Sequence, residues 1–103
     1  MDELKKRIVS FCQDRDWLKF NTPKEVAIGL TLEACEVLEL FRYKDSSERK
    51  KLENEMADVF FCLLLLAHIE KIDLRIALLN KLKENEMKYP IHLAKGTAKN
   101  MMN

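Results

Sequence analysis

The sequence predicts an all-α fold, an antiparallel four-helix bundle that is completed by dimerisation. Three observations support this expectation. The 103 residues include only two glycines and two prolines. No stretch alternates apolar and polar residues as a half-buried strand would, and apolar residues instead recur at spacings of three and four. Four such segments joined by short polar connectors pack by default as an antiparallel bundle.

The first two helices are expected over residues 2–13 and from Pro23 to about residues 43–44. The start of the second helix is well marked. Thr22 can accept a hydrogen bond as its cap, Pro23 suits the first helical position, and Glu25 completes a capping box. The segment between these two helices reads as a connector because it is polar and carries two aromatic residues.

The third and fourth helices are expected over residues 47–70 and 74–88. The first half of the third helix is charged, whereas its second half, which includes the run "VFFCLLLLA" at residues 59–67, is apolar almost all round. A helix that is apolar on every side is buried on every side, which favours a partner chain. The fourth helix follows Asp73 as its cap and is stopped by Pro90.

The chain is short enough to form one domain, predicted over residues 1–103, with a core at about 2–90 and a C-terminal tail at 91–103. Its hydrophobic content of 48% exceeds what a chain of this length easily hides by itself. We therefore expect a homodimer, or a homotetramer built as a dimer of dimers.

Charge and apolar content narrow the classes of partner. The formal net charge is +1, from 18 basic and 17 acidic residues, so no excess of one sign directs the chain to nucleic acid or to an anionic membrane. The nine-residue apolar run is about half the length that spans a bilayer. A cytoplasmic location is expected. The three cysteines form no CxxC pair, so we expect them reduced and packed as small apolar groups.

The stretch "LTLEACEVLEL", residues 30–40, has the apolar content of a core helix but carries three glutamates. On a helical wheel, Glu33 lies inside the apolar arc, about 60° from Leu30. Glu36 lies at the edge of this arc, and Glu39 lies on the opposite face, where solvent is its expected surrounding. Only Glu33 and Glu36 therefore need a compensating partner.

The third helix repeats the pattern, because Glu55 and Asp58 share a stripe with apolar residues and are neighbours on the helix surface. If the two helices pack side by side, four carboxylates converge. Lysines from "ERKKLENE" could neutralise them as ordinary boundary residues, or a divalent cation could. No histidine stands three residues after Glu33, Glu36 or Glu55, which argues against a di-iron bundle. A ligand set of oxygens alone points to Mg²⁺ or Mn²⁺.

The fourth helix adds a polar group to an apolar stripe. Asn85 lies within about 20° of the centre of the stripe formed by Leu78, Leu82 and Tyr89, and Lys81 lies at its margin. A core asparagine must be hydrogen-bonded, either to fix the helix register or to bind a ligand.

The pattern Glu-x-x-Glu followed by Glu-x-x-Asp, with 18 residues between the two pairs, resembles the signature of the MazG-like all-α nucleoside triphosphate pyrophosphohydrolases. The flanking segments "RDWLKFNTPKEVA", "EMADVFFCLLLLA" and "KLKENEMKYPIHLAKG" are most similar to the dCTP pyrophosphatase branch. The resemblance covers about residues 14–96.

The resemblance implies an enzyme that hydrolyses a (deoxy)nucleoside triphosphate to the monophosphate and pyrophosphate, in a house-cleaning role for the nucleotide pool. It implies Mg²⁺, with Mn²⁺ as a substitute, bound by Glu33, Glu36, Glu55 and Asp58. Glu36 is our choice for the residue that takes the proton from the attacking water. The implied substrate-binding residues are Trp17, Phe20, Tyr43, Lys81, Asn85 and Tyr89.

Four positions depart from the branch. Asn21, Glu25, Cys62 and Ile8 stand where histidine, asparagine, tyrosine and histidine are respectively expected, so the base that is recognised stays open. Two alternatives also stay open. One is a phosphoribosyl-ATP type of pyrophosphohydrolysis on the same scaffold, and the other is a non-enzymatic helical dimer that serves as a scaffold.

Overall fold

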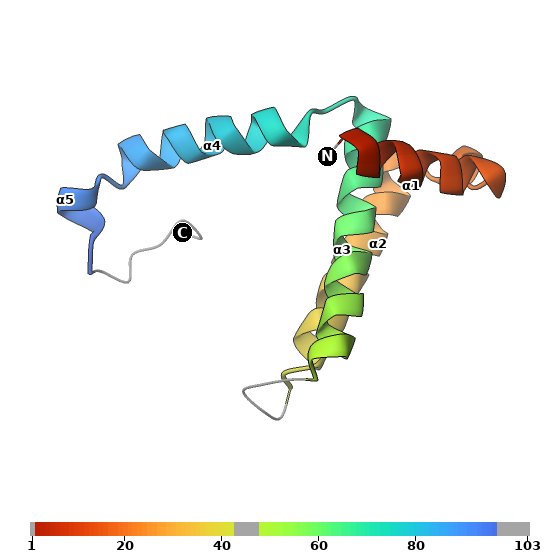
Figure 1. The fold of residues 1–103 in the computed structure, drawn as a ribbon, viewed down its shortest axis with the longest axis horizontal. Coiled ribbons are helices and arrows are strands. Elements are labelled where there is room, and N and C mark those ends of the chain that lie inside the picture. Colours follow the sequence, from red (N-terminus) through yellow and green to blue (C-terminus); the bar gives the residue numbers. More distant parts are fainter. Residues whose placement is uncertain (1, 43–47, 97–103) are drawn as a thin grey trace. The chain divides into compact units, whose positions relative to one another are not determined.

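The structure, a computed structural model, describes residues 2–42 and 48–96, and this described part consists of helices and turns without a strand (Figure 1). The all-α prediction is therefore confirmed. In chain order the elements are α1 (Asp2–Asp14), the 3₁₀ turn η1 (Leu18–Phe20), α2 (Pro23–Glu39), α3 (Arg49–Glu70), α4 (Leu74–Lys88) and α5 (Ile91–Ala94).

The chain divides into two compact units, Met1–Ile72 and Asp73–Asn103. In the first unit, α2 and α3 run antiparallel and lie side by side, and α1 packs against α3 (Figure 1). The second unit contains α4 and α5. Of the predicted bundle, the first unit contains α1 and the antiparallel α2–α3 pair. The four-helix arrangement and the dimer stay predictions.

The Thr22 and Asp73 side chains cap the starts of α2 and α4 as predicted. The Thr22 hydroxyl accepts a hydrogen bond from the Glu25 N–H at 3.2 Å, and Pro23 occupies the first turn of α2. The Asp73 carboxylate accepts a hydrogen bond from the Ile76 N–H at 3.1 Å at the start of α4. Each side chain satisfies one of the N–H groups that a helix start leaves without a helical partner.

Helices α1 and α3 end in the same backbone motif. In each, a residue with positive φ follows the helix, Asp16 at 56° and Lys71 at 57°. The next N–H then bonds back over five residues, from Trp17 to the Cys12 carbonyl at 2.9 Å and from Ile72 to the Ala67 carbonyl at 2.8 Å. These bonds form a Schellman motif, which satisfies the last carbonyls of each helix but usually has glycine at the left-handed position.

The end of α2 differs from the expectation. The helix ends at Glu39 rather than near residues 43–44, because the N–H groups of residues 40–42 bond three residues back, to the carbonyls of residues 37–39. This tighter pattern closes the helix without the glycine or proline that would mark a stop in the sequence. Residues 43–47, which include Tyr43 and the expected start of α3, lie outside the described residues.

The core of the first unit is small. The buried apolar residues among those described are Cys12, Val26, Leu64, Leu65 and Ala67. They bury the contact of α1 with the α2–α3 pair, but Phe60 and Leu63 on the apolar half of α3 remain 39% and 36% exposed. In this chain α3 is therefore not covered all round. None of the described helices has both the length and the apolar content needed to cross a membrane.

Candidate metal centre

Three acidic side chains from two helices meet in the first unit. Glu33 on α2 and Glu55 and Asp58 on α3 each offer a carboxylate oxygen, and these oxygens lie within 4.8 Å of one another. Glu33 and Glu55 are half-buried, whereas Asp58 is exposed. We call these three residues the acidic cluster.

The antiparallel register of α2 and α3 explains the meeting. A Cβ placed on Gly29 would lie 3.8 Å from the Cys62 sulfur, so these two residues face each other across the helix pair. Moving about one turn toward the C-terminus of α2 reaches Glu33, and one turn toward the N-terminus of α3 reaches Asp58. Two i, i+4 steps in opposite chain directions therefore bring the two acids together.

The surroundings of Glu33 favour its protonated form. Burial raises the pKa of the Glu33 carboxyl, and the neighbouring charges of Asp58, Glu55 and Glu36 raise this pKa further. Burial also raises the pKa of the adjacent Cys62 thiol, with smaller contributions from Glu33 and Asp58. The thiol therefore stays neutral beside the acids.

No lysine or arginine compensates the acidic cluster within the described part of the chain. The ion pairs found there are short-range surface pairs on single helices, and their acidic members are Glu39, Glu48, Glu53 and Glu84. The interpretation of Glu33, Glu55 and Asp58 as boundary residues paired to lysines is thus not supported in this region.

The two remaining glutamates of α2 behave differently. Glu36 is exposed and lies outside the acidic cluster, although its charge still acts on Glu33. Glu39 is exposed and pairs with Arg42 at 3.0 Å, which confirms its prediction as a solvated residue. Of the four predicted metal ligands, the structure therefore brings three together and leaves Glu36 at their edge.

The chemistry of the cluster fits a hard divalent cation. Mg²⁺ and Mn²⁺ prefer carboxylate oxygens, and such a cation would offset the repulsion that, after burial, raises the pKa of Glu33. Cys62 is a soft donor beside the acids, and burial raises the pKa of its thiol, which disfavours the thiolate that a soft metal needs. The donor set therefore matches the predicted metal.

An apolar groove of about 330 Å³ lies between α2 and α3. Ala34 and Val37 line it from α2, and Met56, Val59, Phe60 and Leu63 line it from α3. Ala34, Met56 and Val59 directly follow Glu33, Glu55 and Asp58, so the groove and the acidic cluster arise from neighbouring positions.

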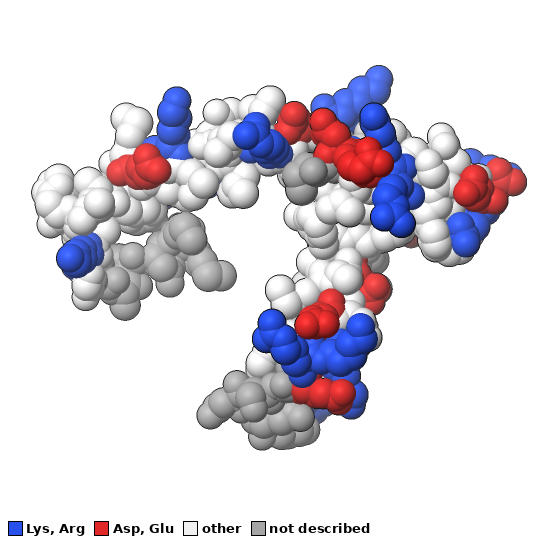
Figure 2. Space-filling model, in the orientation of Figure 1, with Lys and Arg blue, Asp and Glu red and all other residues white. Residues whose placement is uncertain are grey.

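Charged side chains of both signs gather on the surface over the N-terminal part of α3 (Figure 2).

The predicted base-stacking residues have different surroundings. Trp17 is 47% exposed and makes an edge-to-face contact with Phe11, at 5.6 Å between ring centroids. Phe11 makes a second such contact with Phe61 of α3 at 6.0 Å, which connects Trp17 to the helix that carries the acids. Phe20 is 69% exposed, and Tyr43 lies outside the described residues.

Sequence reasoning missed the supporting role of Phe11. In a Schellman motif the residue after the left-handed position commonly packs against the last turn of the helix, and Trp17 packs on Phe11 in this way. The Arg15 guanidinium also lies 3.8 Å from the centroid of the Phe11 ring. A left-handed residue at position 16 would have indicated this packing. The sequence does not mark that position, because it has aspartate there instead of the usual glycine.

The predicted residues of the fourth helix lie in the second unit. Lys81 forms an exposed pair with Glu84 at 3.4 Å, and Asn85 is half-buried on α4. The Tyr89 N–H bonds the Asn85 carbonyl at 2.7 Å, and the Lys88 ammonium lies 5.3 Å from the centroid of the Tyr89 ring. The spacing of four places Lys81 and Asn85 on one side of α4, and Tyr89 is the residue that caps its end.

Comparisons with known proteins indicate the family of the chain. The MazG nucleotide pyrophosphohydrolase domain matches residues 21–90. The chain is 31% identical over 108 residues to dCTP pyrophosphatase 1 from Rattus norvegicus and 30% identical over 109 residues to the protein of that name from Homo sapiens. These alignments cover 95% and 96% of this chain but 64% of each relative, so the chain spans somewhat less than two-thirds of their length.

A solved structure supports the same assignment. The crystal structure of a pyrophosphatase from Archaeoglobus fulgidus superposes with a TM-score of 0.82 at 35% identity, over 87% of this chain and 92% of the other. The domain match at residues 21–90 includes both helices that carry the acidic cluster. The chain belongs to the family of MazG nucleotide pyrophosphohydrolase domains.

Proposed function

We propose that the protein hydrolyses a (deoxy)nucleoside triphosphate to the monophosphate and pyrophosphate, with Mg²⁺ bound by Glu33, Glu36, Glu55 and Asp58. The observation that carries this proposal is the acidic cluster, three carboxylates within 4.8 Å that no described basic side chain neutralises. The relatives named as pyrophosphatases support the reaction class.

A cation held by the acidic cluster would supply the positive charge that compensates a bound triphosphate. Bound Mg²⁺ would neutralise phosphate oxygens and lower the pKa of a bound water. Glu33, Glu55 and Asp58 hold their oxygens on two packed helices, so the position of the cation relative to the substrate is set before the substrate arrives. Without a cation the same acids would repel a triphosphate.

Glu36 is proposed as the residue that takes the proton. It lies one turn beyond Glu33 on α2 and stands outside the group of three close oxygens, so one of its oxygens can remain unbound to metal. In the reaction a water oxygen forms a bond to the α-phosphorus, the bond from that phosphorus to the bridging oxygen breaks, and pyrophosphate leaves. Glu36 accepts the proton that the water loses.

Trp17 and Phe20 are proposed to stack on the base, with Tyr43 as a further aromatic candidate. Trp17 is suited to this because Phe11 fixes one edge of its ring while about half of its surface remains open. Lys81, Asn85 and Tyr89 are proposed to contact the nucleotide from α4. The first candidate substrate is dCTP, because the relatives are named for it.

A homodimer, or a homotetramer of two such dimers, is proposed to complete the fold. The apolar groove of α2 and α3, with the exposed Phe60 and Leu63 in its lining, is an unfavourable surface in water. A second copy that covers this face would supply the apolar contacts that the small core of one chain lacks. A house-cleaning role in the cytoplasm completes the proposal.

The test is pyrophosphate release from a panel of canonical and modified nucleoside triphosphates and phosphoribosyl-ATP, with Mg²⁺, with Mn²⁺ and without metal. We expect turnover of at least one nucleoside triphosphate that depends on the metal. Turnover of phosphoribosyl-ATP alone would reassign the substrate. No turnover of any compound by the folded protein would leave the non-enzymatic dimer as the better description.

A further inference from the structure

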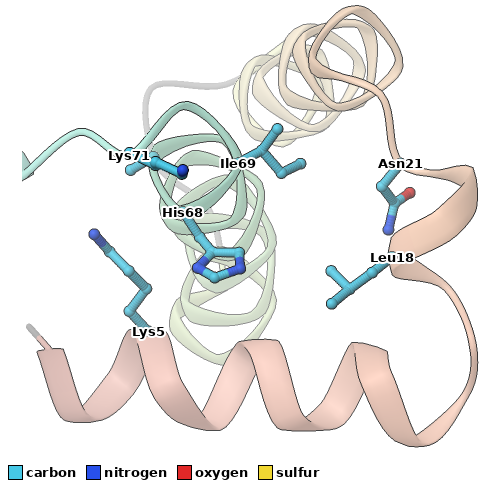
Figure 3. Close-up of a pocket in the computed structure, with 7 residues that line it drawn as sticks. Lys5, Leu18, Asn21, His68, Ile69 and Lys71 are labelled. Atoms are coloured by element: carbon cyan, nitrogen blue, oxygen red, sulfur yellow. The ribbon is translucent and has the colours of Figure 1, made fainter.

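We propose that the first unit carries a second binding site, for a small organic anion, where the start of α1, the η1 turn and the end of α3 meet. The site is a cavity of about 440 Å³, within the usual size of small-molecule pockets. Lys5, Asn21, His68 and Lys71 supply its polar groups, and Leu18 and Ile69 form apolar walls. Figure 3 shows Lys5 and Lys71 on one side of His68, and Leu18 and Asn21 on the other.

This cavity is separate from the acidic cluster. Ile69 stands eleven residues after Asp58 on the same helix, which corresponds to about 16 Å along the helix axis. None of the residues that line the cavity belongs to the acidic cluster or to the groove between α2 and α3. The two sites therefore lie at different levels of α3.

The charge of the cavity indicates the sign of its ligand. Its lining contains two ammonium groups, an imidazole and an amide, but no carboxylate. Neither Lys5 nor Lys71 forms an ion pair with a carboxylate of the described residues. Two cations that share a cavity without an acid are compensated best by an anion, because ammonium, imidazole and amide N–H groups can each donate a hydrogen bond to a phosphate or carboxylate oxygen.

The backbone holds the two lysines at the cavity. The Lys5 ammonium donates one hydrogen bond to the Ile72 carbonyl at 3.1 Å, which leaves two of its three donors for a ligand. Lys71 stands at the left-handed position that ends α3, with φ of 57°. Glycine is favoured at this position because it has no Cβ to clash with the backbone. A lysine there is conformationally strained, and its side chain lines this cavity.

The apolar walls indicate that the anion is part of a larger molecule. The cavity is much larger than an inorganic phosphate, and Leu18, Ala67 and Ile69 offer apolar surface to the rest of the ligand. We therefore assign to the site an anion with a compact apolar or aromatic body, for which phenyl phosphate is a suitable probe.

The test is a titration of the full chain in metal-free buffer, followed by the backbone amide signals in ¹H–¹⁵N spectra. Without metal, the acidic cluster repels the probe, so binding there does not interfere. We expect phenyl phosphate to shift the signals of Asn21, His68 and Lys71 saturably. Lys71→Gln should weaken this binding about tenfold, as expected for loss of a hydrogen bond to a charged group.

Matched controls make each outcome decisive. Lys51→Gln, which alters an exposed lysine near the opposite end of α3, should leave the affinity unchanged. Equal binding of benzyl alcohol, a neutral ring compound, would overturn the anion assignment, and equal binding of inorganic phosphate would overturn the role of the apolar walls. A loss of stability in Lys5→Gln and Lys71→Gln with unchanged affinity would show that the lysines serve only the end of α3.

Discussion

At the scale of single residues, Glu33 combines partial burial with three acidic neighbours. The helical wheel predicts the burial, because the residue falls inside the apolar arc of its helix. The wheel does not predict the convergence with Glu55 and Asp58, because the face of a helix does not specify which neighbour it meets. The register that aligns Gly29 with Cys62 supplies that information.

Stability in the absence of metal should fall as Glu33 ionises. The pKa of Glu33 in the folded protein lies above the usual value of 4.5, so the folded state binds this proton more tightly than the unfolded state does. The contribution of Glu33 is therefore most favourable at low pH and is lost as the pH rises through its folded pKa. As the pH rises through this range, Glu33→Gln should therefore become more stable relative to the wild type.

Urea unfolding of both proteins in metal-free buffer at a series of pH values measures this difference. Glu39→Gln is the matched control, because Glu39 is exposed and pairs with Arg42 on the surface. If the difference in free energy of unfolding between Glu33→Gln and the wild type does not vary with pH, the raised pKa of Glu33 is contradicted.

Removing one charge of the cluster should separate activity from stability. Glu55→Gln and Asp58→Asn should each lower metal-dependent turnover by roughly 100-fold or more, since a metal ligand contributes several kcal/mol of charge stabilisation. Their melting temperatures without metal should equal or exceed that of the wild type, because like charges are relieved. Loss of activity together with a lower metal-free melting temperature would indicate a structural role instead.

At the scale of elements, the helices were predictable where side chains mark their limits. Thr22 and Asp73 cap the starts of α2 and α4 as expected. The end of α2 was not predictable, because three-residue backbone bonds close it without a distinctive residue. The short α5 was not predicted either, since its four residues provide too little periodicity.

The left-handed end of α3 leads to a prediction at this scale. Lys71→Gly should raise the free energy of unfolding by about 0.5–1 kcal/mol, because glycine adopts positive φ without a Cβ clash. The free energy gained by removing this clash exceeds the cost of the larger conformational entropy that glycine has in the unfolded chain. Lys71→Ala loses the same side chain but keeps the clash, so it should show no gain. Chemical denaturation of the two variants compares them directly, and equal stabilities would exclude backbone strain.

At the scale of the whole molecule, apolar surface exceeds what one chain buries. The high hydrophobic content predicts this imbalance, and the exposed Phe60, Leu63 and Met56 on α3 show where part of it lies. The sequence does not reveal the groove itself, because its lining alternates between two helices. The spacing of apolar residues along the sequence also does not specify which partner would cover the groove.

An added charge in the groove should disrupt the proposed homodimer. Phe60→Asp places a carboxylate on the apolar surface of α3, and burying it against a second copy would cost several kcal/mol. Sedimentation should show a dimer or tetramer for the wild type and a smaller species for this variant. Leu4→Asp on α1, at a comparably exposed position, should leave the assembly intact, whereas an unchanged assembly in Phe60→Asp would exclude this face as the interface.

The open groove between α2 and α3 also has a consequence for how the protein responds to its own abundance. If a second copy covers the groove, folding and association are one equilibrium, and mass action makes the melting temperature rise with chain concentration. At high dilution the amount of assembled protein then increases with the square of the chain concentration. Any activity that requires the assembled form would then more than double when the chain concentration doubles.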